Sequence, residues 1–314
     1  MLGLLRTARL TPAATATAKL ALGARAASTV GGALDEAVER LPHKEALRSI
    51  KQELRWSFKE LNAIVDEVAF GLHSLKFEPG NVLAVWLPNN AENVITQLAA
   101  AKAGITLAVI DPKVSTAEEI EFILHDSKAS GLLFEPKIAG RNQTAIVQGI
   151  FPELATFRDE FKVFRPKNFR SLHTVISTGF EPVEGIAQFH QVMVNAPEKH
   201  EAAALKKAVN EKTPLAVSYS KVDGQNPKKG EVLTHADVLK RANDLAKNLS
   251  LTPTDKILIT GEETALSFAP VAAIEKSSLV VLPSAEFDSE AIKHALKLEP
   301  CSIVGSGAAN FKRV

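Results

Sequence analysis

The sequence contains only one cysteine, Cys301. One cysteine cannot form an intramolecular disulfide, and a zinc cluster built on several cysteines is excluded for the same reason. A reducing compartment is consistent with this count.

Long hydrophobic runs and an excess of charge of one sign are also missing. No stretch approaches the roughly eighteen uninterrupted apolar residues of a transmembrane helix, so we predict none. The formal net charge is +1, which gives no electrostatic reason to expect nucleic-acid binding. The remaining composition is ordinary for a globular protein. It comprises 314 residues, 46% hydrophobic and 23% charged, enough for one large domain or two small ones.

Acidic residues are absent before Asp35, where the chain is rich in alanine, serine and threonine. The basic residues of this stretch are Arg6, Arg9, Lys19 and Arg25. Such a composition is typical of an organelle transit peptide. We therefore predict a mitochondrial presequence over residues 1–28. The mature protein is expected on the matrix side, either free or peripheral to the inner membrane. The alternative is a disordered basic tail.

Hydrophobic periodicity alternates between helix and strand beyond Leu34. Capping boxes predict helix starts at Ser57, Thr116 and Thr234, each with an acidic residue three positions later. Buried strands are predicted over residues 81–87, 106–110, 131–135, 256–260, 278–283 and 301–305. Strands separated by helices of this length favour βαβ units, so the predicted fold class is layered α/β with mainly parallel sheets.

We divide the chain where the regular alternation of helices and strands is interrupted. We predict a first α/β subdomain over residues 29–136 and a second over 214–314. Between them, residues 137–213 are less regular and predict an insert and linker, with an exposed charged helix over 195–214.

The stretch SYSKVDGQNPKKGEVLTH, residues 218–235, contains the candidate site. A loop that cradles phosphate normally uses small and hydroxylated residues, so that backbone N–H groups point at the anion. This loop instead has Lys221, Val222 and Asp223 at its turn. The alternative interpretation is a solvated charged loop without a ligand.

Two stretches together resemble the adenylate-forming superfamily of acyl-CoA synthetases and their relatives. Residues 81–136 have a strand ending in Leu-Pro-Asn, a helix closing at Ala-Gly, an Asp-Pro, and a helix ending in Asp-Ser before the next strand. Residues 218–235 stand where that family has Ser-Gly-Thr-Thr-Gly-x-Pro-Lys-Gly followed by Thr-His. Residues 277–307 follow the family order as well.

The resemblance implies a site for the ATP triphosphate in this loop. The positions that match it are Ser220, Gly224, Pro227, Lys228, Gly230 and His235. Lys221 replaces a glycine that lets the backbone approach phosphate, and valine cannot donate the hydrogen bond of a threonine. Asp223 would repel a phosphate charge about 4 Å away by roughly 1 kcal/mol in water. We therefore predict a vestigial phosphate loop. The alternative interpretation of His235 is a residue of the surface or of the helix-capping region.

The family's later elements are not found before Val314: a Thr-Glu segment, a ribose-binding aspartate and a lysine on a C-terminal domain. No catalytic residue, metal site or cofactor is predicted in their place, and the dispersed histidines lack metal-ligand spacing. The resemblance therefore suggests a truncated relative without adenylating activity.

The main functional prediction is a non-catalytic accessory subunit of a mitochondrial inner-membrane complex, with other subunits as partners. By analogy alone, ATP synthase is the most concrete candidate. The alternatives are a nucleotide- or acyl-CoA-binding module, or a fragment of an active acyl-CoA synthetase.

Overall fold

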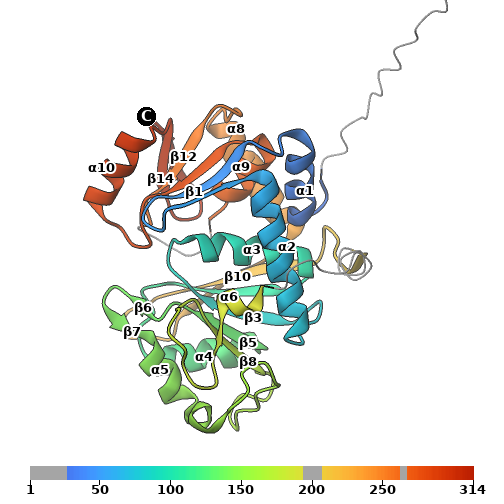
Figure 1. Cartoon of the computed structure of the whole chain (residues 1–314), viewed down its shortest axis with the longest axis vertical. Helices are drawn as coiled ribbons and strands as arrows, with labels where there is room; N and C mark the ends of the chain where they lie inside the picture. The colour runs from blue at the N-terminus through green and yellow to red at the C-terminus, as the bar shows by residue number, and fades with distance from the viewer. Residues whose placement is uncertain (1–26, 194–206, 262–266) are drawn as a thin grey trace, which may run out of the picture.

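The computed structural model describes residues 27–193, 207–261 and 267–314 (Figure 1). The predicted presequence therefore lies outside the described residues except for Ala27 and Ser28. The first part of the predicted charged helix at 195–214 lies outside them too. Within the described residues, no helix combines the length and the apolar character needed to cross a bilayer.

Sheet A, in the upper half of Figure 1, has the strand order β15-β14-β12-β13-β1-β2. The four inner strands are parallel, and the two edge strands β15 and β2 are antiparallel to their neighbours. Its strands are β1 (Glu45–Ser49), β2 (Leu54–Ser57), β12 (Lys256–Ile259), β13 (Leu279–Leu282), β14 (Ile303–Ser306) and β15 (Asn310–Arg313).

Sheet B, in the lower half, has the order β11-β10-β4-β3-β5-β8-β9, and all pairs except β10–β11 are parallel. Its strands are β3 (Val82–Trp86), β4 (Thr106–Ile110), β5 (Gly131–Phe134), β8 (Thr174–Ser177), β9 (Ala187–Gln188), β10 (Pro214–Ser220) and β11 (Lys228–Thr234). A separate two-stranded ribbon pairs β6 (Lys137–Ile138) with β7 (Arg141–Asn142). The predicted fold class is confirmed.

Helices fill three layers around the two sheets (Figure 1). Between the sheets lie α1 (Val30–Arg40), α2 (Phe58–Ser74), α3 (Ala91–Ala103), α8 (His235–Asn248) and α9 (Ala269–Lys276), with the short α6 (Phe189–Val192) beside them. Outside sheet B lie α4 (Ala117–Ser127), α5 (Gln143–Ile150) and the 3₁₀ turn η1 (Pro152–Thr156). Outside sheet A lies α10 (Ser289–Leu298).

Strand alternation explains this layering. In β3, Leu83 and Val85 belong to the core shared with sheet A, whereas Ala84 and Trp86 belong to the core under α4 and α5. Successive side chains of a strand point to opposite faces, so a strand that is apolar throughout must be covered on both faces. The continuous apolar runs in the sequence therefore require helices on both sides of each sheet.

Local capping agrees with the sequence. Ser57 with Glu60, Thr116 with Glu119, and Thr234 with Asp237 each form a capping box, as predicted. Gly104 ends α3 at φ +70°, a conformation that glycine adopts without steric cost. These helix boundaries are confirmed.

The three predicted segments do not correspond to separate sheets. Sheet A takes β1 and β2 from the first segment and β12 to β15 from the last. Sheet B takes strands from all three, since β8 and β9 lie within residues 137–213. The predicted boundaries therefore describe segments of the sequence, and the division into subdomains stays a prediction.

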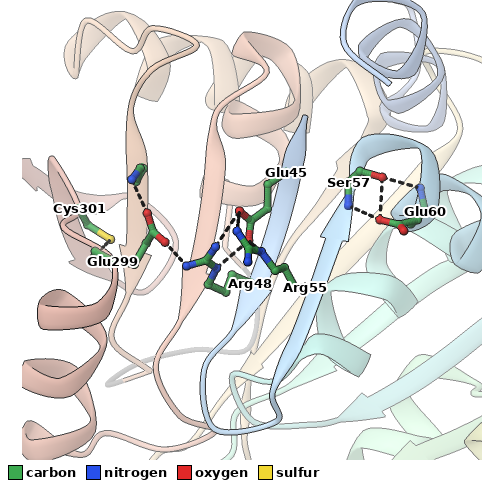
Figure 2. A network of polar contacts seen from close by, with 8 residues as sticks. Glu45, Arg48, Arg55, Ser57, Glu60, Glu299 and Cys301 are labelled. Atoms are coloured by element: carbon green, nitrogen blue, oxygen red, sulfur yellow. Dashed lines mark hydrogen bonds and ion pairs between the residues drawn. The ribbon is translucent and has the colours of Figure 1, made fainter. Parts of the chain in front are cut away.

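The outer face of sheet A has a ladder of charges where α10 does not cover it. Figure 2 shows Arg48 between Glu45 and Glu299, with Arg55 on the far side of Glu45. Arg48 Nε lies 2.6 Å from Glu45 Oε1, and Lys256 also pairs with Glu299. The ladder joins β2, β1, β12 and the end of α10 across this outer face, with Arg48 and Glu299 largely covered.

One buried lysine holds three helices of the middle layer together. The Nζ atom of Lys102 in α3 lies 2.9 Å from Asp35 of α1, and 2.6 Å from both Asn62 and Asp66 of α2. The Lys102 side chain is only 4% exposed. A Cβ on Gly31 would lie 2.8 Å from Lys102 Cγ, so glycine leaves room for the lysine stem.

We predict that Lys102→Met lowers the free energy of unfolding by about 2–4 kcal/mol, because two carboxylates lose their buried partner and face one another. Lys113→Met, at an exposed lysine, is the matched control and should change it by less than about 0.5 kcal/mol. Urea unfolding of both variants measures the difference. Equal midpoints for the two variants would show that Lys102 contributes nothing to holding the helices.

Candidate functional site

The carboxyl ends of the two sheets meet at the loop that follows β3. The backbone N–H of Asn89 donates to Ala285 O at 2.9 Å, and its side-chain Nδ2 donates to Ile259 O at 3.0 Å. Ile259 ends β12, and Ala285 follows β13. In parallel α/β sheets, ligands bind beyond the carboxyl ends of the strands. This junction is therefore the first place to look for a site.

The candidate loop is the turn of an antiparallel hairpin at the same edge of sheet B. β10 ends at Ser220, which pairs with Lys228 at the start of β11. Gly224 has φ +70° with open space around it. The residues that follow the turn form a strand before the helix begins. The sequence pattern had placed no strand there.

The sequence suggested that Lys221 would obstruct the turn, but it does not. Its N–H donates to Asp111 Oδ2 at 3.3 Å, and its Nζ pairs with Glu119 of α4. The left-handed conformation of the turn falls on Gly224, where glycine is retained, and not on Lys221. The replaced glycine therefore costs the backbone no strain, and the lysine side chain points away to α4.

Lys229 anchors the hairpin at a second point. Its Nζ lies 2.8 Å from Asp126 Oδ2 and 5.9 Å from the ring centroid of Tyr219. The Tyr219 hydroxyl donates to the same Asp126 oxygen at 2.6 Å. Lys229 and then Tyr219 lower the pKa of Asp126 by bonding its charged form. Two contacts with α4 thus fix the hairpin.

Lys228 remains the available cation of the loop. It is exposed, and its ammonium makes no hydrogen bond or ion pair with any described residue. Ser220 is half-buried beside it, Asp223 is exposed, and Pro227 is buried. Gly230 fits against β10 because a Cβ there would lie 2.5 Å from Ser218 Oγ.

His235 lies apart from the other five predicted residues. β11 runs back along β10, so the turn at Gly224 and the start of α8 are at opposite ends of the hairpin. His235 is fully buried, and its Nδ1 accepts a hydrogen bond from the N–H of Val30 at 3.1 Å. Burial lowers its pKa to about 4. The alternative of a surface histidine is wrong, although the residue does begin a helix.

A half-buried carboxyl at the same edge was missed by the sequence analysis. Glu135 follows β5 and accepts hydrogen bonds from Thr178 Oγ1 at 2.6 Å and Asn90 Nδ2 at 3.1 Å. Burial is the main cause that raises its pKa, and the charges of Glu92 and Glu286 raise it further. The sequence did contain a signal for this group of polar residues, because Asn90, Glu135 and Thr178 each follow a strand. Among the described residues, no group of histidine, cysteine or acidic side chains is arranged to hold a metal ion.

Residues 34–162 match the protein family described as AMP-binding enzyme. The medium-chain acyl-CoA ligase ACSF2, mitochondrial, of Rattus norvegicus is 28% identical over 226 residues, which are 71% of this chain and 36% of that protein. The putative acyl-CoA synthetase YngI of Bacillus subtilis (strain 168) is 22% identical over 281 residues, 88% of this chain and 50% of that protein. This chain thus spans about a third of the mitochondrial relative and half of the bacterial one.

Solved structures share the fold at lower identity. A putative long-chain-fatty-acid CoA ligase from Rhodopseudomonas palustris CGA009 superposes with a TM-score of 0.70 at 16% identity, over 89% of this chain and 63% of that one. The anthranilate CoA ligase AuaEII, in complex with anthranoyl-AMP, gives 0.69 at 16% identity, over 88% of this chain and 49% of that one. The architecture is that of the N-terminal domain of acyl-CoA synthetase-like enzymes. Together with the family match, these similarities support the adenylate-forming superfamily.

These findings correct the main functional prediction. The expected accessory subunit of ATP synthase or another inner-membrane complex is wrong, because the matched proteins are acyl-CoA ligases. They favour the alternative, a fragment of an acyl-CoA synthetase. The prediction that this chain is not an enzyme is contradicted by the same relatives, and nothing supports partner subunits. This chain spans only part of the relatives' length, so the family elements not found before Val314 carry no information about activity.

We predict that the neutral, buried His235 makes stability depend on pH. Its pKa falls from the ordinary 6.5 to about 4 on folding. As pH falls from 6.5 to about 4, the unfolded state takes up a proton first. The free energy of unfolding should therefore fall by about 3 kcal/mol over this range. His235→Asn keeps an acceptor for Val30 but cannot titrate.

Chemical unfolding at several pH values checks this prediction. The difference in unfolding free energy between the wild type and His235→Asn should change steeply between pH 6.5 and pH 4 and level off outside that range. A difference that stays constant over this range would show that His235 is not the group responsible.

Proposed function

We propose that this chain is part of an acid–thiol ligase of the adenylate-forming type, which joins a carboxylic acid to coenzyme A at the expense of ATP. The observation that carries the proposal is the similarity to acyl-CoA ligases over 226 residues. A likeness of that length extends far beyond a single loop. The junction of the two sheets at Asn89 supports it, since polar groups gather there at the carboxyl ends of the strands.

The reaction class has two steps. A carboxylate oxygen attacks the α-phosphorus of ATP and expels pyrophosphate, which leaves an acyl-adenylate. The sulfur of coenzyme A then attacks the acyl carbon and expels AMP, while the thiol proton is released. Both steps develop negative charge on phosphoryl oxygens, which fixed donors and cations can stabilise.

In this proposal the β10–β11 turn holds the polyphosphate. Ser220 donates its hydroxyl, the open backbone around Gly224 offers N–H groups, and Lys228 supplies the free ammonium. Asp223 opposes this by roughly 1 kcal/mol for each nearby phosphate charge in water. Lys228 is exposed on the same turn and offsets that repulsion. Lys221 and Lys229 hold the turn on α4 and leave its centre open.

The substrate class and location follow the relatives. ACSF2 proteins are described as medium-chain ligases of mitochondria. We therefore propose a medium-chain fatty acid as the substrate and the mitochondrion as the location. The basic, acid-poor residues 1–28 favour the same compartment.

The test is thioester formation by the protein in its natural full length, supplied with ATP, Mg²⁺, coenzyme A and medium-chain fatty acids. We predict acyl-CoA by mass spectrometry and fatty-acid-dependent exchange of pyrophosphate into ATP. Lys228→Ala should lower kcat/KM for ATP by about 10- to 100-fold through lost charge stabilisation.

Lys240→Ala, at an exposed lysine of α8, is the matched control and should leave the rate unchanged. If neither exchange nor thioester forms with any fatty acid tested, and ATP does not bind, the ligase assignment fails. Full activity in Lys228→Ala would instead exclude this lysine from the phosphate site.

A further inference from the structure

A hollow lies at the opposite edge of sheet B from the proposed ligase site. It has a volume of about 350 Å³ and lies between the end of α4 and the turn that precedes β8. Its lining residues are Leu124, His125, Lys128, Asn168, Phe169, Arg170 and Ser171. The strands β5 and β8 begin here, whereas the candidate loop lies where β10 ends. The two places are therefore separated by the length of the strands.

The hollow is cationic. Its charged side chains are those of Lys128 and Arg170, both exposed; His125 lines it as well, and none of the described residues that line it is acidic. The side chains of Lys128 and Arg170 make no ion pair or hydrogen bond with any described residue. The nearest carboxylate in sequence, Asp126, is already bound by Tyr219 and Lys229.

A simpler explanation covers only part of this pattern. Basic residues in the last turn of a helix stabilise its dipole, and His125 and Lys128 end α4. Arg170 and Asn168 come from a different segment, about forty residues later in the chain, and line the same hollow. The dipole of α4 does not explain why Arg170 and Asn168 line the same hollow as the end of that helix.

The walls of the hollow are held rigidly. The His125 ring stacks on Phe169 with centroids 4.4 Å apart, and Phe169 packs edge-on against Phe151 at 5.1 Å. Ser171 Oγ donates to Ala129 O at 3.0 Å, and the N–H of His173 donates to Ser130 O at 2.8 Å. The aromatic and backbone walls are thus fixed before binding, so the entropy lost when a ligand enters comes from Lys128 and Arg170.

We propose that this hollow binds a phosphate ester. An arginine fork binds phosphate oxygens in a bidentate manner, and a lysine adds a point charge beside it. A phosphomonoester carries close to two negative charges at neutral pH, which match Lys128 and Arg170. The volume corresponds to that of about twelve liquid waters, so a small organic group fits beside the phosphate. This site is independent of the proposed ligase chemistry.

The phosphate could be carried by a soluble metabolite or by a lipid headgroup, and the experiment separates these sources. Glycerol 3-phosphate is titrated by calorimetry, with sodium acetate as the anion control. Vesicles of phosphatidylcholine with phosphatidic acid are tested by co-sedimentation, with pure phosphatidylcholine as the blank. We expect binding in at least one arm, and the arm identifies the source.

Arg170→Gln and Lys128→Gln should each weaken that binding by at least about tenfold, the loss expected for one charge-assisted bond. Both residues are exposed, so the variants should fold; Lys240→Gln is the matched control. The proposal is overturned if neither probe binds, if acetate competes equally, or if the Arg170→Gln and Lys128→Gln variants bind like wild type. Binding lost instead in Lys228→Ala would belong to the loop and would also overturn it.

Discussion

One layer of helices that is apolar on both sides is the constraint on which the structure depends. α3 is buried almost throughout, with Leu98 and the alanines at 99–101 packed in the core that both sheets share. A helix that is hydrophobic all round requires cover on every side. The two sheets provide that cover, and Lys102 adds the polar contacts that join α3 to α1 and α2. The remaining helices then lie on the outer faces of the sheets.

Because both sheets pack on this layer, their carboxyl edges come together at the loop after β3. Asn89 bonds to the end of β12 and to the loop after β13, and Asn90 bonds to Glu135, which follows β5. The β10–β11 turn lies at the same edge of sheet B. Polar groups from the loops that follow strands of both sheets are therefore gathered at this edge.

At the candidate loop, the residue types alone did not reveal the directions of the side chains. Lys221 and Asp223 suggested a phosphate site that no longer works. In the structure Lys221 is paired with Glu119, the positive φ falls on Gly224, and Lys228 forms no ion pair with the residues that the structure describes. The basic hollow beside α4 gives the opposite case, since His125, Lys128 and Arg170 show no pattern in the sequence and converge only in space.

The sequence by itself determined the local structure: the capping boxes at Ser57, Thr116 and Thr234, the buried strands, and the mainly parallel α/β class. These features depend on contacts within a few residues and on alternation along one strand, both of which are visible in the sequence. Only the tertiary structure decided that β10 and β11 form a hairpin, that His235 is buried against Val30 away from the turn, and that Glu135 lies beside Asn90. The contacts of His235 and Glu135 join residues that are distant in sequence. The strand order is not visible in any local pattern, since sheet A combines strands from both ends of the chain and sheet B is formed from residues 82–234.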